Sequence, residues 1–436
     1  MESYILDWAN LLLRWLHVIT AIAWVGSSFY FVFLDSSLTP PKDEDLKKQG
    51  VSGELWALHG GGFYHPVKFA GAPPKLPEHT HWFYWESYTT WLSGFALLTV
   101  SYLWNANIYL VNPADPIMSS STAIVVALAF LVVFWLLYNG ICRIFGEKQG
   151  GDGIVGALVL VLVCIASYLA CHLFPGQAAF LLIGAMLATS MSANVFFWII
   201  PGQKKMVAAI KAGEPVDPIH GQRGKQRSVH NTYFTLPVLF AMLSNHYGWL
   251  YNHDLNWLVL ILMMFAGAAI RQFFVMRHGY KLGRNPHPWK YAAVGVAVLL
   301  GVMVWLKPAA PVATPATPAT PATPATPATP ATPAASAVPA NSAGTGTQAS
   351  AAAASAGSYE NVRIIMQQHC VVCHSSETIA QKNVKFDSPE EVKSHAQQIY
   401  QQVVLLRKMP FGNPGALSDT EREAIKQWFE NGAALN

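Results

Sequence analysis

Long apolar runs alternate with short polar segments over about the first three hundred residues of the chain. A helix needs about 20 mostly apolar residues to cross a bilayer, because the hydrocarbon core is about 30 Å thick and each residue adds about 1.5 Å. Runs of this length predict eight spans, at about 5–34, 82–104, 119–141, 153–173, 177–200, 229–250, 255–276 and 288–306. We therefore expect residues 1–307 to form an all-α, polytopic helical membrane bundle.

The loops between these predicted spans differ in their content of basic residues. The first, third, fifth and seventh loops carry Lys and Arg, whereas the second, fourth and sixth contain neither. Basic loops are retained in the cytoplasm, so the odd-numbered loops are predicted to be cytoplasmic and both ends of the bundle to face outward. The acidic N-terminus, MESYILDWAN, lacks the basic segment of a signal peptide, so we interpret it as the start of a retained helix.

Composition supports a lipid bilayer as the partner of this chain. Hydrophobic residues make up 52% and charged residues only 12% of the sequence, against about 25% charged in soluble domains. The net charge of +4 gives no argument for nucleic acid binding. Three of the five cysteines lie in apolar runs, where we expect small buried side chains and no disulfide framework.

The sequence after residue 307 changes character twice. Residues 308–357 form a Pro/Ala/Thr-rich segment that ends in an Ala/Ser/Gly stretch. Proline at every third position favours extended polyproline II at about 3.1 Å per residue, so a semi-rigid to flexible linker is predicted. Residues 358–436 then resemble a small all-α domain of the class I cytochrome c type.

The stretch QQHCVVCHSSE is typical of covalent c-type heme attachment. Cys370 and Cys373 are spaced to form two thioethers with one heme c, and the imidazole of His374 then ligates the iron. Met409, followed by Pro410, lies where such domains present the second axial ligand. This heme is attached outside the cytoplasmic membrane, which agrees with the orientation predicted from the loops.

The last helix of this domain has its own start signal. In LSDTEREAIKQWFENGA, Ser418 is an expected N-cap, and Glu421 follows three residues later. This spacing predicts a capping box, in which the two residues bond each other's backbone N–H groups. An aromatic stripe follows, so the helix is expected to be amphipathic.

Histidines inside the predicted spans are candidate ligands for a second heme. Electrons that cross a layer of about 30 Å need a carrier, and helix bundles build heme b sites from inward-facing histidines. His17 with His246 is the first candidate pair, and His172 is the reserve. A histidine that only packs between helices is the alternative interpretation of His17.

Four further residues are candidates for binding or catalysis in the bundle. Lys68 and Glu86 belong to an aromatic, Gly- and His-rich stretch, which predicts either a folded binding loop or interfacial aromatic anchoring. His230 lies at the cytoplasmic end of the sixth span. Arg271 lies inside the seventh, where an unpaired guanidinium is costly, so it is expected to meet an anionic ligand or a carboxylate such as Glu86.

The segments WLHVITAIAWVGSSFYF, LHGGGFY, HWFYWESYTTWLSGF and HNTYFTLPVLFAMLSNHY, followed by a linker and a cytochrome c, resemble the bacterial membrane-bound urate oxidases, or urate hydroxylases. The resemblance implies an enzyme that oxidises urate to 5-hydroxyisourate with water as the oxygen source. It also implies that electrons leave through the cytochrome domain to an acceptor of the respiratory chain, without hydrogen peroxide. The expected location is the bacterial inner membrane, with the N-terminus and the cytochrome on the periplasmic side.

Urate is a planar monoanion, and this chemistry assigns candidate roles. Arg271 or Lys68 would neutralise it, and Glu86 or His230 would take the proton of the attacking water. A bundle that binds urate from the outer side would need no heme b. Two other classes stay open: a non-catalytic electron-transfer subunit that serves a separate dehydrogenase, and a transporter with a fused redox regulator.

Overall fold

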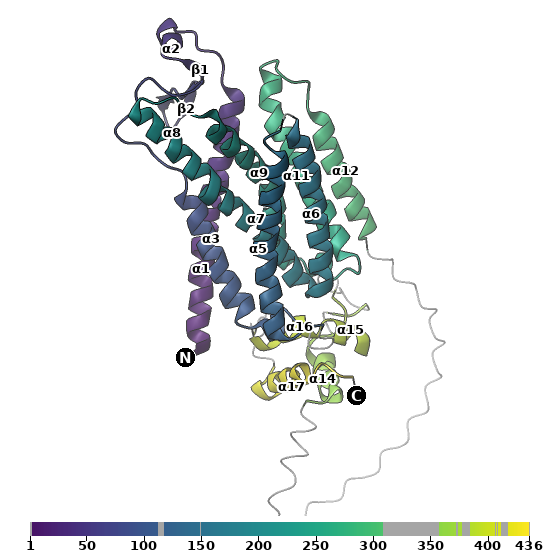
Figure 1. Ribbon diagram of the computed structural model, residues 1–436. Coiled ribbons are helices and arrows are strands. Elements are labelled where there is room, and N and C mark those ends of the chain that lie inside the picture. Colours follow the sequence, from purple (N-terminus) through teal and green to yellow (C-terminus); the bar gives the residue numbers. More distant parts are fainter. Residues whose placement is uncertain are drawn as a thin grey trace, which may run out of the picture. The chain divides into compact units, whose positions relative to one another are not determined.

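A computed structural model describes residues 2–111, 117–148, 150–307, 357–371, 374–376, 384–405, 407, 409–410 and 417–435 of the chain. The chain divides into two compact units, Met1–Leu306 and Lys307–Asn436. The described residues are mostly helical in both units (Figure 1).

The first unit is a bundle of long helices. They are α1 (Glu2–Ser37), α3 (Trp85–Leu98), α5 (Ser120–Phe145), α6 (Gly151–Leu173), α7 (Gly176–Asn194), α8 (Ile200–Ala212), α9 (Pro218–Leu243), α11 (Asn256–Lys281) and α12 (Trp289–Trp305). Short helical segments are α4 (Ala106–Tyr109), α10 (Gly248–Tyr251), the π-helical turns η1 (Thr99–Leu103) and η2 (Val195–Ile199), and the 3₁₀ turn η3 (Ser244–His246). Helix α7 packs against α5, α6 and α9 and carries much of the core.

Five helices among the described residues are long and apolar enough to cross a membrane. They are Trp8–Ser37, Ser120–Phe145, Gly151–Leu173, Gly176–Ala212 and Asn256–Lys281. The expectation of eight spans is therefore shown only in part. Of the other three predicted spans, α12 is 17 residues long, α3 has 14 residues before its π-helical turn, and α9 begins with a polar stretch.

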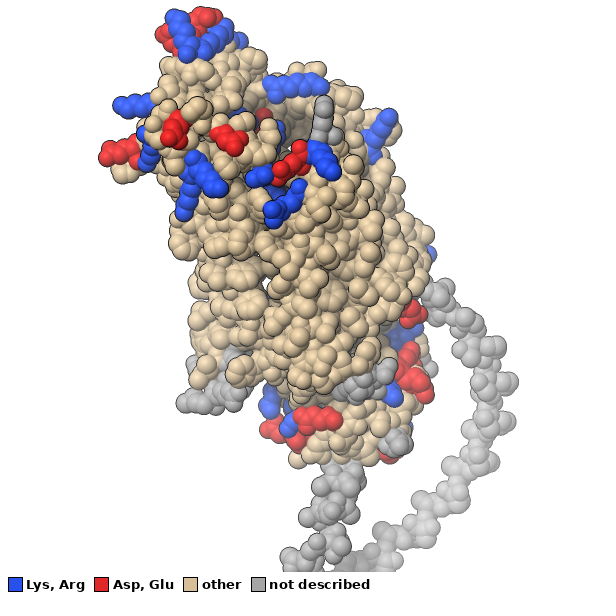
Figure 2. All heavy atoms as spheres, in the orientation of Figure 1, with Lys and Arg blue, Asp and Glu red and all other residues tan. Residues whose placement is uncertain are grey.

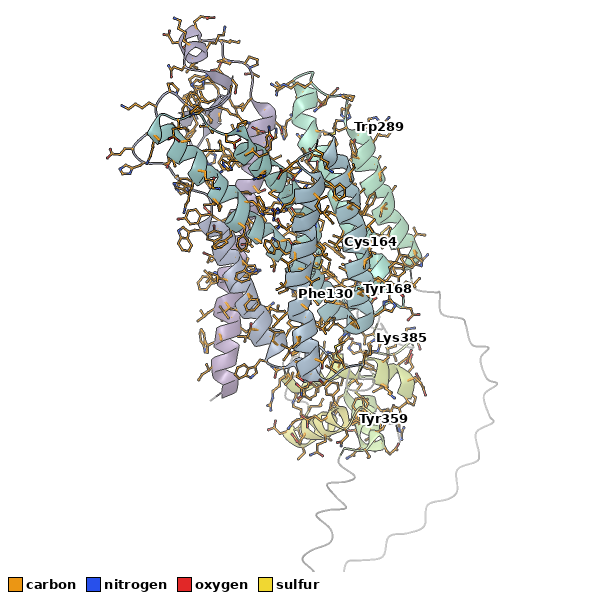
Figure 3. All side chains as sticks on the ribbon, in the orientation of Figure 1. Phe130, Cys164, Tyr168, Trp289, Tyr359 and Lys385 are labelled. Carbon is orange, nitrogen blue, oxygen red and sulfur yellow. The ribbon has the colours of Figure 1, made fainter. Side chains whose placement is uncertain are left out.

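The surface of the first unit has the composition of a protein in a bilayer. Its charged side chains gather at the end that carries α2 and α8, and a broad uncharged belt lies below them on the visible face (Figure 2). Trp289 lies near this charged end, and Tyr168 lies toward the opposite end (Figure 3). Trp289 and Trp305, which begin and end α12, are 57% and 39% exposed. Exposed aromatic residues at both ends of spans are typical of membrane interfaces.

The segment between α1 and α3 is folded, as one of the two sequence interpretations expected. Helix α2 (Glu44–Lys48) precedes two small antiparallel sheets, formed by β1 (Val51–Glu54) with β4 (Val67–Phe69) and by β2 (Ala57–His59) with β3 (Gly62–Tyr64). Gly60 and Gly61 turn the second hairpin with φ of +58° and +81°, which glycine adopts without strain. These strands depart from the all-α expectation, and whether this loop binds a ligand stays a prediction.

The carboxylate of Glu54 stabilises this loop through two hydrogen bonds. Glu54 accepts hydrogen bonds from the backbone N–H of Lys42 at 2.9 Å and from His65 Nε2 at 2.7 Å. The bond from Lys42 and then that from His65 lower the pKa of Glu54 below its ordinary value. The His65 ring also stacks on Trp56 with 4.1 Å between ring centroids. Hydrogen bonds to Glu54 therefore stabilise the loop, and its aromatic surface at Trp56 is exposed.

The second unit contains short helices around a small core. They are α14 (Tyr359–His369), α15 (Pro389–Ser394), α16 (Ala396–Ile399), the π-helical turn η5 (Tyr400–Leu405) and α17 (Asp419–Glu430). Tyr400 stacks on Phe429, and Trp428 faces Tyr359. The predicted capping box is confirmed: Ser418 Oγ accepts from the backbone N–H of Glu421, and the Glu421 carboxylate accepts from that of Ser418.

We expect Ser418→Ala to weaken α17 by about 1 kcal/mol, about fivefold in local opening, because an N-cap contributes about that much. The bonds from Ser418 lower the pKa of Glu421, so this carboxylate stabilises the fold above its ordinary pKa of about 4.3. That stabilisation is lost as the pH falls through the lowered pKa. The measurement is hydrogen exchange of α14 and α17 peptides in the whole protein, with the exposed Ser394→Ala as the control. Equal exchange in wild type and Ser418→Ala at neutral pH would contradict this role.

Candidate functional site

A cluster of polar side chains is buried between α5, α7 and α9 in the first unit. We call it the polar centre, and it consists of Tyr138 and Asn139 from α5, Asn194 from α7, and Arg227, His230 and Asn231 from α9. Residues 227, 230 and 231 share one face of α9, because positions three and four apart are neighbours on a helix. Burying this many polar groups costs free energy unless each group has a hydrogen-bond partner.

A chain of hydrogen bonds connects Asn231 with His230. The Nδ2 group of Asn231 donates to the carbonyl oxygen of Met191 at 3.0 Å, so its Oδ1 accepts from Asn194 Nδ2 at 2.9 Å. Asn194 Nδ2 also donates to the Tyr138 hydroxyl at 2.9 Å. The Tyr138 hydroxyl is hydrogen-bonded to His230 Nδ1 at 2.8 Å, and Cys142 Sγ lies 3.7 Å from the same nitrogen. A neutral His230 with Nδ1 as acceptor carries its hydrogen on Nε2.

Arg227 supplies a buried positive charge beside this chain. Its side chain is 2% exposed and lies over the rings of Tyr138 and Trp198, at 5.0 and 5.1 Å from their centroids. Nη2 donates to Asn139 Oδ1 at 2.9 Å, whereas Nη1 has no hydrogen-bond partner in the described part of the chain. No carboxylate forms an ion pair with Arg227 among the described residues. A guanidinium that is held by rings and one amide keeps a donor for an anionic group.

The polar centre also keeps an unused acceptor. Asn194 is fully buried, and its Oδ1 has no hydrogen-bond partner in the described part of the chain. The centre therefore offers a buried donor on Arg227 and a buried acceptor on Asn194. An unpaired buried donor or acceptor costs free energy, so both atoms are candidates for binding a polar ligand.

The chain after Asn194 positions one wall of this centre. Helix α7 passes into the π-helical turn η2, and α8 continues from Ile200. A π-helical turn inserts extra residues into a helix and is frequent at functional sites. Here it holds Trp198 against Arg227 and Phe197 against Trp135 of α5, with 5.0 Å between those two ring centroids.

A second buried guanidinium lies on another side of α9. Arg271 of α11 is 5% exposed and stacks on Phe29 of α1, with 3.7 Å from its central carbon to the ring centroid. Its Nε and Nη2 have no hydrogen-bond partner within the residues that the structure describes. The neighbouring Gln272 accepts a hydrogen bond from Tyr233 of α9.

The expected pairing of Arg271 with Glu86 is not among the ion pairs of the described residues. Glu86 lies half-buried in the first turn of α3, where its backbone carbonyl accepts from Thr90. Lys68 of β4 pairs with Asp35 near the end of α1 and is half exposed. The structure thus leaves Lys68, Glu86 and Arg271 in separate surroundings and places only His230 in the polar centre.

The three candidate heme b ligands have different surroundings. The Nδ1 of His17 is bonded to Thr90 O at 3.0 Å and Ser93 Oγ at 3.1 Å, and its ring packs against Gly94. His246 is exposed in the turn η3, and His172 is exposed and bonded to Tyr168 O within its own helix. No described hydrogen bond or ring contact joins His17 to either of them.

In the second unit, the described part of the heme c motif has a suitable arrangement. Cys370 is buried at the end of α14. His374 Nδ1 donates to Val384 O at 3.1 Å, which directs Nε2 to serve as a ligand. Met409 is half-buried, and its backbone N–H donates to Gln402 O at 3.2 Å. Cys373 lies outside the described residues.

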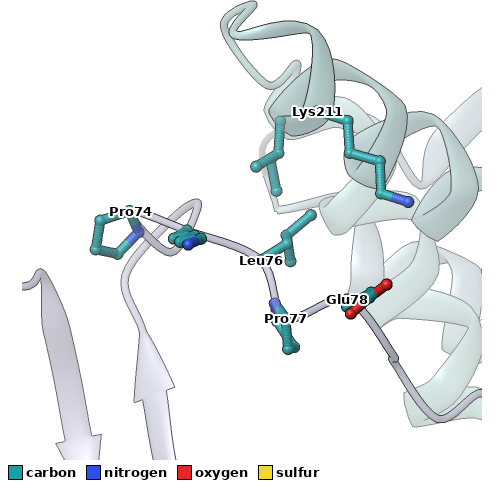
Figure 4. Close-up of a pocket in the computed structure, with 7 residues that line it drawn as sticks. Pro74, Leu76, Pro77, Glu78 and Lys211 are labelled. Atoms are coloured by element: carbon teal, nitrogen blue, oxygen red, sulfur yellow. The ribbon is translucent and has the colours of Figure 1, made fainter.

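A shallow surface hollow lies between the segment before α3 and the end of α8 (Figure 4). Its volume is about 360 Å³, and it is lined by Pro74, Lys75, Leu76, Pro77, Glu78, Ile210 and Lys211. It contains no aromatic ring and no buried polar group, so it offers little for a planar ligand.

The family model described as urate oxidase N-terminal matches residues 3–307, which is most of the chain. The chain belongs to this urate oxidase family. No curated protein and no solved structure matches it. The matched segment runs from α1 through α12 and so contains the polar centre and Arg271. Urate-related oxidation is thus the activity that the family indicates, and the fusion to a cytochrome c stays a prediction.

Sequence reasoning for this family member missed most of the polar centre. Arg227 lies in the predicted fifth loop, between the spans 177–200 and 229–250, and no role was predicted for it or for Tyr138, Asn139, Asn194 and Asn231. A usable signal was present, because an asparagine inside the apolar run 177–200 must find partners in a bilayer. The sequence could not show which helices supply those partners.

Proposed function

We propose that this chain oxidises urate to 5-hydroxyisourate in the membrane and passes the electrons to a heme c in residues 358–436, and from there to an acceptor of the respiratory chain. Urate and water give 5-hydroxyisourate, two protons and two electrons, so the oxygen comes from water and no hydrogen peroxide forms. The observation that carries the proposal is a buried, incompletely paired Arg227 within the segment that matches the urate oxidase family.

The polar centre supplies the groups that this reaction needs. Nη1 of Arg227 would bind the negative oxygen of urate, and Oδ1 of Asn194 would accept from a ring N–H. As water attacks, the Tyr138 oxygen would take its proton while the Tyr138 hydrogen moves to Nδ1 of His230. His230 would then hold the charge as an imidazolium inside a hydrogen-bonded site. Arg271 is the second candidate for the anion, because it is also buried and its Nε and Nη2 have no hydrogen-bond partner among the described residues.

The residues of the second unit fit a covalent heme c. Cys370 and Cys373 would form the thioethers, and His374 and Met409 would be the axial ligands. When bound, the group supplies a one-electron carrier whose potential is raised by Met/His ligation. Heme c attachment also requires residues 358–436 to lie on the periplasmic side of a bacterial inner membrane, with the N-terminus on the same side.

The direct test is anaerobic mixing of purified, oxidised protein with urate. We expect the c-heme absorbance to change to the reduced form, with about two hemes reduced for each urate consumed, since the reaction releases two electrons. Hydrogen peroxide should stay at background when oxygen and an acceptor are supplied. No heme reduction by urate would refute the proposal and favour the non-catalytic subunit that serves a separate dehydrogenase.

The contacts of His17 suit a heme ligand, because its Nδ1 is bonded to Thr90 and Ser93 of α3 and its Nε2 would bind the iron. A single heme b ligated by His17 therefore remains a proposal, whereas pairing with His246 has no support in the described contacts. We expect His17→Ala to remove a heme that acid acetone extracts and to leave the covalent heme in place. The matched control is His172→Ala, on an exposed histidine. Wild-type protein that yields only covalent heme would exclude heme b in the bundle.

A further inference from the structure

A hollow of about 430 Å³ opens beside the polar centre and has an aromatic lining. Tyr84 and Tyr88 at the start of α3 contribute two rings, with 5.2 Å between their centroids. Phe196 and Phe197 of η2 contribute two more, and Phe196 lies 5.5 Å from Tyr88, edge to face. The other lining residues are Ile200, Pro201 and Lys204 of α8. Its volume lies within the range of about 300–1,000 Å³ that is usual for small-molecule sites.

The lining has the chemistry of a site for a planar anion. Several aromatic faces and edges meet at one hollow, and Phe196 and Phe197 remain 55% and 53% exposed. Lys204 is the only cationic residue in the lining and is exposed to solvent. Flat heterocycles stack on such rings, and an ammonium group attracts their negative charge. An apolar lipid tail would use the rings but not Lys204.

Lys204 lies where an ion from water can reach it. The continuous helical segment Gly176–Ala212 has 37 residues and, at about 1.5 Å per residue, is longer than the hydrocarbon core of about 30 Å. Its C-terminal part carries Lys204, Lys205 and Lys211 and must therefore extend beyond the core. The hollow thus opens at the charged end of the first unit.

The hollow and the polar centre share η2 as a common wall. Phe196 and Phe197 line the hollow, whereas Trp198 lies over Arg227 in the polar centre. We propose that this aromatic hollow is the capture site for urate, in which the rings receive the planar purine and Lys204 its negative charge before it reaches the polar centre. This inference rests on the proposed function and adds where the substrate first binds.

The test compares Lys204→Gln with Lys205→Gln, its neighbour outside the hollow. We expect Lys204→Gln to lower kcat/KM for urate about tenfold, to weaken urate binding in anaerobic equilibrium dialysis equally, and to leave kcat unchanged at saturating urate. Lys205→Gln should match wild type in all three. Equal effects of both variants, or no effect of Lys204→Gln, would overturn the capture site.

A second pair of variants tests the rings and excludes lipid as the occupant. Phe196→Leu should weaken urate binding, and Phe265→Leu, on an exposed phenylalanine of α11, should not. Urate binding that depends on Lys204 but yields no oxidation would support the hollow and refute the proposed enzyme. If urate is oxidised and neither Lys204→Gln nor Phe196→Leu changes its binding, the proposed enzyme is supported and the capture site is refuted. Retention of an anionic phospholipid that depends on Lys204 and that urate cannot displace would also overturn the capture site.

Discussion

Replacing Arg227 with glutamine should lower kcat/KM for urate by about 30-fold to several thousand-fold. The guanidinium is buried between two rings, and its Nη1 is the unused donor of the polar centre. Losing one buried charged contact costs about 2–5 kcal/mol, and each 1.4 kcal/mol is tenfold in affinity. Glutamine keeps an amide that can bond Asn139, so the site should remain folded. The measurement is urate-driven reduction of the c heme under anaerobic conditions.

Arg223→Gln is the matched control, because Arg223 lies one turn earlier on α9 and is partly exposed. It pairs with Glu147 at 2.8 Å and lies 5.8 Å from the Trp198 ring, so only its burial and pairing differ from those of Arg227. We expect near wild-type turnover from Arg223→Gln and a partial return of activity in Arg227→Lys. If Arg271→Gln abolishes urate binding while Arg227→Gln does not, the anion binds near Phe29 and the polar centre is only structural.

The positions of most helices could be predicted because hydrophobic runs report burial in lipid directly. The predicted run at 119–141 begins one residue before α5 and otherwise lies within it, and the run at 153–173 lies within α6. The prediction was less complete where function or backbone irregularity interrupts the pattern. Helix α9 begins in a polar segment that a span prediction leaves out, yet it carries Arg227. The π-helical turn η2 is also invisible to a pattern based on 3.6 residues per turn.

Site residues were harder to predict. A polar or charged residue inside a predicted span shows that it needs a partner, but the sequence does not show which residue that partner is. Arg271 was expected to meet an anionic ligand or a carboxylate such as Glu86, and among the described residues its guanidinium stacks on Phe29. His230 was identified as polar within a span, yet its bond to Tyr138 joins residues 92 positions apart in the chain. By contrast, the capping box of Ser418 and Glu421 was predicted correctly, since both partners lie within one helical turn. Local chemistry can be read from sequence, whereas contacts between helices need the fold.

The double variant Cys370→Ala, Cys373→Ala should lose covalent heme completely and, with it, all electron transfer from urate to an external cytochrome acceptor. Two thioethers hold the group in such domains, and His374 alone cannot replace them. The first unit forms its own core and should be unaffected. Urate binding in equilibrium dialysis should therefore survive, whereas turnover should stop.

A suitable control is Cys164→Ala, because Cys164 lies in α6 within the bundle and has no part in the motif. It should keep both the heme and the activity. Measuring hydrogen peroxide in the double variant distinguishes two routes for the electrons, to oxygen within the bundle or to the heme of the second unit. If the variant still consumes urate in air and forms hydrogen peroxide, oxygen accepts the electrons within the bundle and the heme is not required. If it binds urate but consumes none, the electrons from urate leave through the second unit.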